Sequence, residues 1–154
     1  MSVGVDPRER LRQGSDEKMV GNPGRRPAEI AVIYGDPVVG QTLALLLAGA
    51  GYQVSEVSLV SVQDRARMER MLESVLVIVL APGLEVGLRD TFLGSLKREE
   101  RFSHIPVLEL GTQPEGARYS ADYTSMWPGR TEDLVRRIEK IFLEQRRGFN
   151  MNQA

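Results

Sequence analysis

Few side chains in this sequence have both the type and the spacing needed for catalysis or metal binding. His104 is the only histidine among the 154 residues, and the sequence contains no cysteine. A lone imidazole makes neither a metal site nor a catalytic triad, because both need further groups that converge on it. No nucleophile is paired with a base in a recognisable pattern. We therefore expect no enzymatic activity, no metal site and no cofactor.

The turn from Gly35 to Thr42 comes nearest to a ligand-binding motif. It reads Gly-Asp-Pro-Val-Val-Gly-Gln-Thr, which differs from the phosphate-binding pattern G-x-x-x-x-G-K-[ST] by the replacement of the lysine with Gln41. Without that lysine the contact with the β- and γ-phosphates is lost, and Pro37 stiffens a loop whose backbone must wrap around phosphate. A helix N-terminus still attracts anions. Small-ligand or nucleotide sensing through this turn is therefore an alternative functional hypothesis.

The bulk composition indicates one globular domain without a strong charge bias. The 20 basic and 21 acidic residues nearly cancel, to a formal net charge of −1. Nucleic-acid and membrane binding are not expected, because both depend on a basic surplus. The longest apolar run, residues 75–82, is far shorter than the ~20 residues that cross a bilayer, and arginines interrupt the N-terminus where a signal peptide is apolar. We expect a cytoplasmic protein.

The chain divides into three parts by composition. Residues 1–27 combine glycine, proline and charge with few apolar groups, which is typical of an unstructured leader. Residues 28–147 carry the hydrophobic periodicity of a folded domain, and residues 148–154 are predicted to be a flexible tail. A leader that orders on a partner is the alternative for the first part, and docking through Phe149 and Met151 is the alternative for the last.

Short apolar runs alternate with helical patterns through the domain. The predicted strands are residues 30–34, 52–57, 75–81 and 106–110. The predicted helices begin near Pro37, Ser61, Val86 and Thr131. Strands that alternate with helices form right-handed units around a parallel sheet. A site on such a sheet is expected at the carboxyl ends of its strands.

Four stretches of the chain follow one another like the strand ends of one known domain family. They are Ile30–Pro37, Val75–Leu80, Ile105–Thr112 and Ala121–Pro128. The Gly51-Tyr52-x-Val54 sequence and the junction before Val107 add to the likeness. Over residues 29–144 the chain therefore resembles a response-regulator receiver domain. The resemblance implies a CheY-like, flavodoxin-like three-layer α/β sandwich, whose five-stranded parallel sheet has the strand order 2-1-3-4-5.

One element of that family is absent from the sequence pattern. Residues 112–120 contain Pro114 and Gly116 and no apolar stripe, where the family has its fourth helix. We predict that this helix is shortened or missing and replaced by a loop. The surface that receiver domains form with this helix must then differ in this chain.

The residues on which phosphorylation depends in the family are replaced in this sequence. The family uses two acidic residues for Mg²⁺, an aspartate as phosphoacceptor, a threonine or serine, and a lysine. The corresponding positions are Tyr34, Gly35, Val79 (or Ile78), Gly111 and Trp127. Asp36 alone is a poor cage for a hard cation, and valine offers no nucleophile. We therefore predict a degenerate phosphoacceptor pocket formed by Tyr34, Gly35, Asp36, Val79, Gly111 and Trp127.

Without phosphotransfer, the resemblance implies a pseudo-receiver that acts as an adaptor or scaffold in bacterial signalling or cell organisation. Its partner would be another protein, or a second copy in a homodimer. Tyrosine and tryptophan dominate binding hot spots, and five residues around the degenerate pocket are predicted to bind the partner: Tyr34, Arg118, Tyr119, Met126 and Trp127. The alternative for Trp127 is a packing role, in which it fills the space left by the lost carboxylates.

Overall fold

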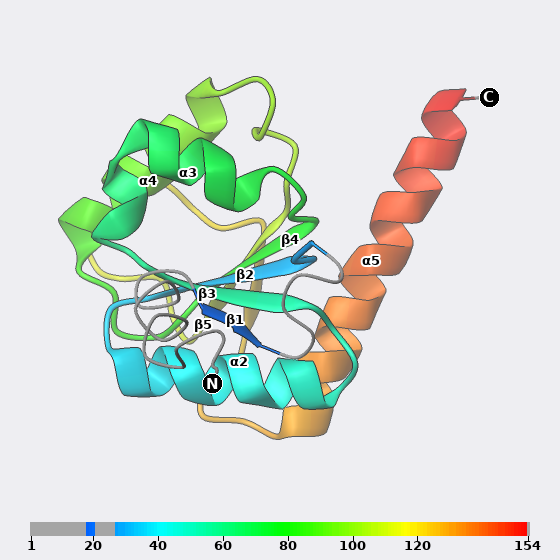
Figure 1. The fold of residues 1–154 in the computed structure, drawn as a ribbon, viewed down its shortest axis with the longest axis horizontal. Helices are drawn as coiled ribbons and strands as arrows, with labels where there is room; N and C mark the ends of the chain where they lie inside the picture. The colour runs from blue at the N-terminus through cyan, green and yellow to red at the C-terminus, as the bar shows by residue number, and fades with distance from the viewer. Residues whose placement is uncertain (1–17, 21–26, 154) are drawn as a thin grey trace, which may run out of the picture.

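A six-stranded sheet forms the middle layer of the structure (Figure 1). The computed structural model describes residues 18–20 and 27–153. The strands are β1 (Lys18–Val20), β2 (Ile30–Tyr34), β3 (Val54–Ser58), β4 (Val77–Leu80), β5 (Val107–Leu110) and β6 (Tyr123–Ser125). Their spatial order is β1-β3-β2-β4-β5-β6, and every pair from β3 to β6 is parallel. This confirms the predicted order 2-1-3-4-5 for the five parallel strands.

The edge strand β1 is a departure from the sequence prediction, because it lies within the range predicted to be unstructured. It pairs antiparallel with β3, with Lys18 opposite Glu56 and Val20 opposite Val54. A strand of three residues is too short for hydrophobic periodicity to reveal. Its pairing covers backbone groups of β3 that would otherwise form an open sheet edge. The rest of the predicted leader, residues 1–17 and 21–26, lies outside the described residues.

Helices cover both faces of the sheet (Figure 1). They are α2 (Pro37–Gly49), the short 3₁₀ helix η1 (Ser61–Gln63), α3 (Arg65–Leu72), α4 (Val86–Arg98) and α5 (Thr131–Gln153). α2 and α5 pack on the face that buries Ile30 and Val32, and η1, α3 and α4 pack on the face that buries Ala31 and Ile33. Successive residues of a strand point to opposite faces, so each face has its own hydrophobic core. In the described part of the chain, no helix is both long and apolar enough to span a bilayer.

The connection between β5 and β6 is a loop, residues 111–122. This confirms the prediction that the fourth helix is shortened or missing and replaced by a loop. Gly116 in the loop has a φ of +82°, a conformation that glycine adopts without strain. The loop is tied to the sheet at its end, where the Val107 N–H donates to the Asp122 carboxylate at 2.8 Å.

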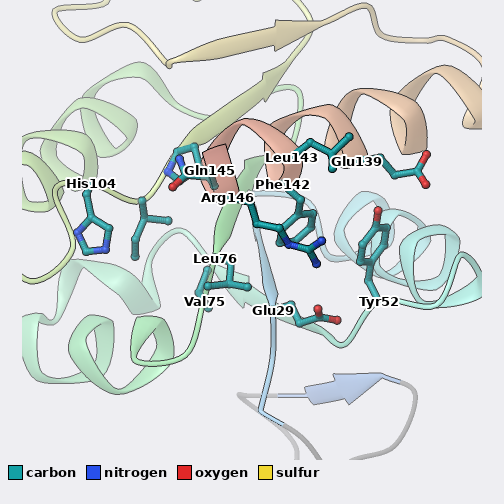
Figure 2. Close-up of a pocket in the computed structure, with 12 residues that line it drawn as sticks. Glu29, Tyr52, Val75, Leu76, His104, Glu139, Phe142, Leu143, Gln145 and Arg146 are labelled. Carbon is teal, nitrogen blue, oxygen red and sulfur yellow. The ribbon is translucent and has the colours of Figure 1, made fainter. Parts of the chain in front are cut away.

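The last helix is longer than predicted. α5 continues to Gln153, so residues 148–153 are helical where the sequence predicts a flexible tail. Gly148 weakens a helix by only about 1 kcal/mol relative to alanine, and no proline follows it. The 23 residues of α5 span about 35 Å. Phe142 of α5 stacks on Tyr52, with ring centroids 5.5 Å apart (Figure 2), and the distal turns project beyond the sheet (Figure 1).

Candidate functional site

The carboxyl ends of the parallel strands form what we call the carboxyl edge of the sheet, marked by Tyr34, Leu80, Leu110 and Ser125. Tyr34 is half-buried here and packs against Gly40 of α2. A Cβ added to Gly40 would lie 2.5 Å from Cγ of Tyr34, so only glycine permits this contact. The buried Leu84 lies 3.6 Å from the Cβ that a side chain at Gly35 would add. Apolar side chains therefore pack beside the positions where phosphorylation would need carboxylates.

Asp36, the acidic residue of the predicted pocket, is the N-cap of α2. Its carboxylate accepts a hydrogen bond from the Val38 N–H at 2.9 Å, and the Thr42 hydroxyl donates to the Val38 carbonyl oxygen at 2.8 Å. A carboxylate in this position occupies a helix N-terminus that would otherwise attract an anion, and it repels phosphate. Among the described residues, no group of three or more His, Cys, Asp or Glu side chains is placed to hold a metal ion. The contacts from Gly35 to Thr42 are those of an ordinary helix start.

The remaining positions of the predicted pocket have no ionisable side chain. Val79 lies inside β4 and is fully buried in the core beneath α2 and α5. Gly111 has a φ of +91°, which a residue with a side chain rarely adopts, and its N–H donates to the Ser125 carbonyl oxygen at 2.8 Å. Trp127 is half-buried against the same core as Val79, and its bond to Pro128 is cis. Packing and a backbone hydrogen bond therefore account for these three positions.

The five residues predicted to bind a partner do not form one cluster. Tyr34 and Trp127 pack against the core on the α2 and α5 face, whereas Tyr119 packs against the core on the α3 and α4 face. The Tyr119 hydroxyl lies 3.1 Å from the position of a Cβ at Gly94, a residue of α4. Met126 has 82% of its surface exposed. The sheet separates Tyr119 from the other two aromatic residues.

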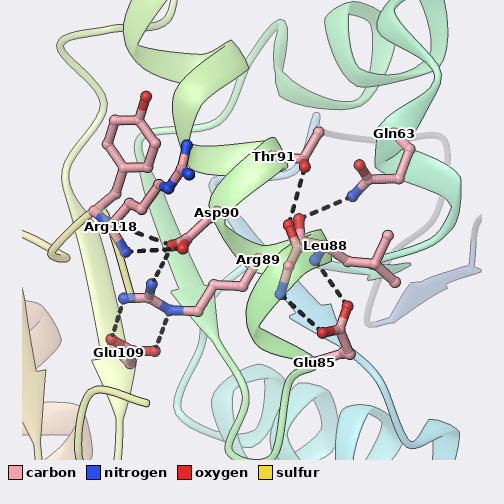
Figure 3. Close-up of polar contacts among 10 residues, drawn as sticks. Gln63, Glu85, Leu88, Arg89, Asp90, Thr91, Glu109 and Arg118 are labelled. Atoms are coloured by element: carbon pink, nitrogen blue, oxygen red, sulfur yellow. Dashed lines mark hydrogen bonds and ion pairs between the residues drawn. The ribbon is translucent and has the colours of Figure 1, made fainter. Parts of the chain in front are cut away.

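Arg118 belongs to a polar network that takes the place of the missing helix (Figure 3). The fully buried Arg89 guanidinium donates to both carboxylate oxygens of Glu109, from Nε at 2.7 Å and from Nη2 at 2.8 Å. Its Nη1 donates to Asp90 at 2.9 Å, and Asp90 also accepts the Arg118 backbone N–H at 2.8 Å. These bonds join α4 to β5 and hold the loop against α4. Our sequence analysis missed this network, although an acidic residue within an apolar strand signals a buried cation.

The opposite edge of the sheet, where β2, β4 and β5 begin, is called the amino edge here and carries an open groove (Figure 2). The groove has a volume of about 620 Å³ and lies between α5 and the segments that lead into these strands. Its apolar lining consists of Val75, Leu76, Ile105, Pro106, Phe142 and Leu143. Leu76 is 51% exposed and Leu143 is 53% exposed, so apolar surface faces solvent. The sequence analysis did not predict this groove.

Two carboxylates, Glu29 and Glu139, also line the groove. Burial of the Tyr52 hydroxyl raises its pKa, and the negative charges of Glu139 and Glu29 raise it further. Both glutamates therefore act electrostatically on the same phenol. Glu29 is also held in place, because its carboxylate accepts the Gln53 N–H at 3.0 Å. The groove thus combines an apolar floor, the stacked pair of Tyr52 and Phe142, and charged groups of both signs, since Arg146 lines it as well.

Comparison with known proteins gives matches in structure but none in sequence. No protein-family model matches the chain, and no curated protein is significantly similar to it. The chemotaxis protein CheY4 of Vibrio cholerae is similar in structure with a TM-score of 0.57 at 19% identity, over 75% of this chain and 99% of that one. The signal receiver domain of a signal transduction histidine kinase from Syntrophus aciditrophicus gives a TM-score of 0.55 at 19% identity, over 74% of this chain and 89% of that one.

A third match adds a receiver domain with its metal bound. The receiver domain of a sensor histidine kinase from Pseudomonas aeruginosa, with magnesium coordinated in its active site cleft, gives a TM-score of 0.55 at 18% identity, over 75% of this chain and 97% of that one. At these identities the likeness establishes the fold alone. The chain has the flavodoxin-like fold of response-regulator receiver domains.

Proposed function

We propose that this chain is a signalling module that works without phosphorylation, by binding another protein. The observation that carries the proposal is the packing of the carboxyl edge. Tyr34 and Leu84 fill it, and Asp36 is engaged as a helix cap. Phosphoryl transfer to a protein side chain needs a nucleophile, a metal and positive charge around the phosphate. The turns after β2 and β4 at this edge offer two carboxylates, Asp36 and Glu85, and both are engaged as helix caps.

A phosphodonor experiment tests the first half of the proposal. The full-length protein is incubated with acetyl phosphate and Mg²⁺, and its intact mass is measured, with CheY4 as the positive control. We expect no phosphorylated species. Amide NMR spectra recorded with Mg²⁺ and beryllofluoride give a second readout. A phosphorylated product, or saturable and Mg²⁺-dependent shifts at Gly35 and Gly111, would contradict the proposal.

The binding half of the proposal rests on the surface around Met126. This exposed side chain lies next to the half-buried Trp127, and both line a small hollow with Leu46 of α2. Methionine adapts to irregular apolar partners, and tryptophan is enriched at binding hot spots. The remaining predicted residue of this edge, Tyr34, has a packing role against Gly40. We therefore assign the contact to Met126 and Trp127.

Affinity capture from the source cell tests this assignment. The wild-type chain is compared with Met126→Asp, which should fold normally because Met126 is mostly exposed. We expect a protein that is recovered with the wild type and lost with this variant. Val60→Asp is the matched control, since Val60 is 67% exposed and does not line the hollow beside Trp127. Capture that survives Met126→Asp would contradict the assignment, and the absence of a specific partner would contradict the adaptor role.

A further inference from the structure

The outward face of α2 carries an uncharged row of residues on the outside of the structure (Figure 1). We call this row the α2 stripe, and its exposed members are Val38, Thr42, Leu45 and Gly49. We infer that the α2 stripe pairs with the same stripe of a second copy of the chain, so that two copies form an antiparallel dimer. The inference goes beyond the proposed function and does not depend on it, because no residue of the stripe lines the hollow beside Trp127.

The composition of α2 differs from that of an ordinary surface helix. Its 13 residues contain no charged side chain, although charged residues make up 27% of the chain. A surface helix normally carries charged residues on its outward face, and a helix without such a face is normally buried. Here Val38 is 70% exposed and Leu45 is 55% exposed. The outward face of α2 therefore has the composition of a surface that is covered.

The spacing of the stripe suits a second helix as its partner. Its members follow one another at intervals of four, three and four residues, which is the alternation of the two core positions in a pair of helices. An antiparallel pairing about the midpoint of the stripe places Val38 opposite Gly49 of the second copy. The same pairing places Leu45 opposite Thr42, and every contact occurs twice. Each larger side chain then meets a smaller one, so the two surfaces interdigitate.

Such a pair also accounts for the glycine at the end of the stripe. Glycine weakens a helix relative to alanine, and no described residue lies within 4 Å of a Cβ added at Gly49. Contacts within the described part of the chain therefore do not require glycine at this position. In the dimer, the open space at Gly49 receives Val38 of the second copy.

The absence of charge favours a second copy over a foreign protein as the occupant. Recognition of a foreign protein commonly uses complementary charges, which steer association and exclude wrong partners. Between Asp36 and Glu56 the chain has no charged residue that could supply them. A two-fold axis brings a surface against its own copy, and an uncharged stripe meets that copy without repulsion between like charges.

The dimer is expected to be weak and reversible. From Val38 to Gly49 the stripe spans about 17 Å of helix. A helix face of this length covers less than the roughly 1,200 Å² that stable interfaces bury in total. We therefore expect self-association at high protein concentration, with monomers and dimers in exchange.

Sedimentation equilibrium of the full-length chain, up to millimolar concentration, tests the inference. We expect a reversible dimer whose Kd rises at least about tenfold in Leu45→Asp, because a charge then lies inside the interface. Val60→Asp is the matched control. Val60 is also exposed and lies outside α2, so this variant should keep the wild-type Kd. Circular dichroism and urea midpoints check that both variants are folded.

A charge exchange tests the antiparallel register. Thr42→Asp and Leu45→Lys should each weaken self-association, because each places a charge against an uncharged side chain. In an equal mixture, the new carboxylate of one chain faces the new ammonium group of the other, so association should recover. The two changed positions do not face each other in a parallel pair.

Three results would each overturn the inference: a wild-type chain that stays monomeric, a dimer insensitive to Leu45→Asp, or a mixture in which association does not recover. A monomeric wild type that loses a captured foreign protein on Leu45→Asp would assign the stripe to that protein instead.

Discussion

The carboxyl and amino edges of this sheet differ in how closely side chains pack there. At the carboxyl edge, Tyr34 lies against Gly40, Leu84 lies near Gly35, and Asp90 of α4 holds the loop between β5 and β6 by accepting the Arg118 N–H. At the amino edge, α5 runs past the ends of the strands and leaves exposed leucines beside a groove. One edge is closed by short turns that pack on themselves, and the other is left open by a long helix.

This contrast teaches that the two edges of one sheet can be packed very differently within the same fold. In open α/β sheets, ligands bind at the carboxyl ends of the strands, and the magnesium of the Pseudomonas aeruginosa receiver domain lies in its active site cleft. At the carboxyl edge of this chain, Tyr34 packs against Gly40, and Asp36 and Glu85 serve as helix caps. An open groove of about 620 Å³ lies at the other edge, so the fold by itself does not locate its function.

Removal of the buried arginine at the closed edge should have the largest effect on stability. Arg89→Leu leaves Glu109 buried without its cation, so we expect a loss of about 3–5 kcal/mol in the free energy of unfolding, measured by urea denaturation. Arg89→Leu/Glu109→Leu should recover much of this loss. Arg65 is the control, because its guanidinium is exposed and pairs with Glu69 and Glu99 at the surface, where ion pairs contribute little. Equal losses in Arg89→Leu and Arg65→Leu would contradict the role of burial.

A methyl group at Gly40 should also weaken the closed edge. Gly40→Ala places a Cβ against the Tyr34 ring, and overpacking of this kind costs about 1–3 kcal/mol. Gly49→Ala is the matched control in the same helix. Nothing lies within 4 Å of a Cβ at Gly49, so this change should be neutral or stabilise α2 by up to about 1 kcal/mol. Thermal or urea unfolding that ranks the two variants alike would refute the contact between Tyr34 and Gly40.

Substitution of Asp36 separates its capping role from metal binding. Asp36→Ala should cost about 1 kcal/mol of stability, and Asp36→Asn, which keeps an acceptor for the Val38 N–H, should cost much less. We expect Mg²⁺ to change the unfolding midpoint of neither variant nor of the wild type. Stabilisation of the wild type alone by Mg²⁺ would show that Asp36 binds the metal.

The smallest expected effect is a titration at the open edge. Burial is the main cause that raises the pKa of Tyr52, and Glu139 adds to it, so Glu139→Gln should lower this pKa only partly. Because the folded pKa is the higher one, the contribution to stability is present below the ordinary pKa of 10.0 and is lost as the pH rises through the folded value. The pKa of Tyr52 is measured from phenolate absorbance as a function of pH, with Tyr52→Phe as the reference. An unchanged pKa in Glu139→Gln would place this carboxylate away from the phenol.

Much of the fold was predictable because its signals are local. Asp36 and Pro37 mark the start of α2, since a cap and a fixed φ act within one turn. The missing fourth helix was predictable from Pro114 and Gly116 for the same reason. The helical end of the chain was predicted wrongly. Gly148 was taken as the end of the helix, but a single glycine only weakens a helix and does not have to end it.

The candidate sites were harder to predict because they depend on distant neighbours. The amino-edge groove brings together Leu76 and Leu143, which are far apart in the sequence, and no motif marks either residue. The five predicted partner-binding residues shared a position near strand ends, but Tyr119 packs on the other face of the sheet from Trp127. Position along the chain does not reveal on which face a loop residue packs.

By itself the sequence determined the order of the helices and of the parallel strands, and the residue types at the carboxyl ends of those strands. Periodicity and residue identity carry both, because a helix, a parallel strand or a missing carboxylate is a local property. Only the tertiary structure decided that Arg89 meets Glu109, that Tyr34 lies against Gly40, and that α5 leaves an open groove. These contacts form when strand order and helix packing bring distant segments together, and the local sequence pattern does not reveal which segments become neighbours.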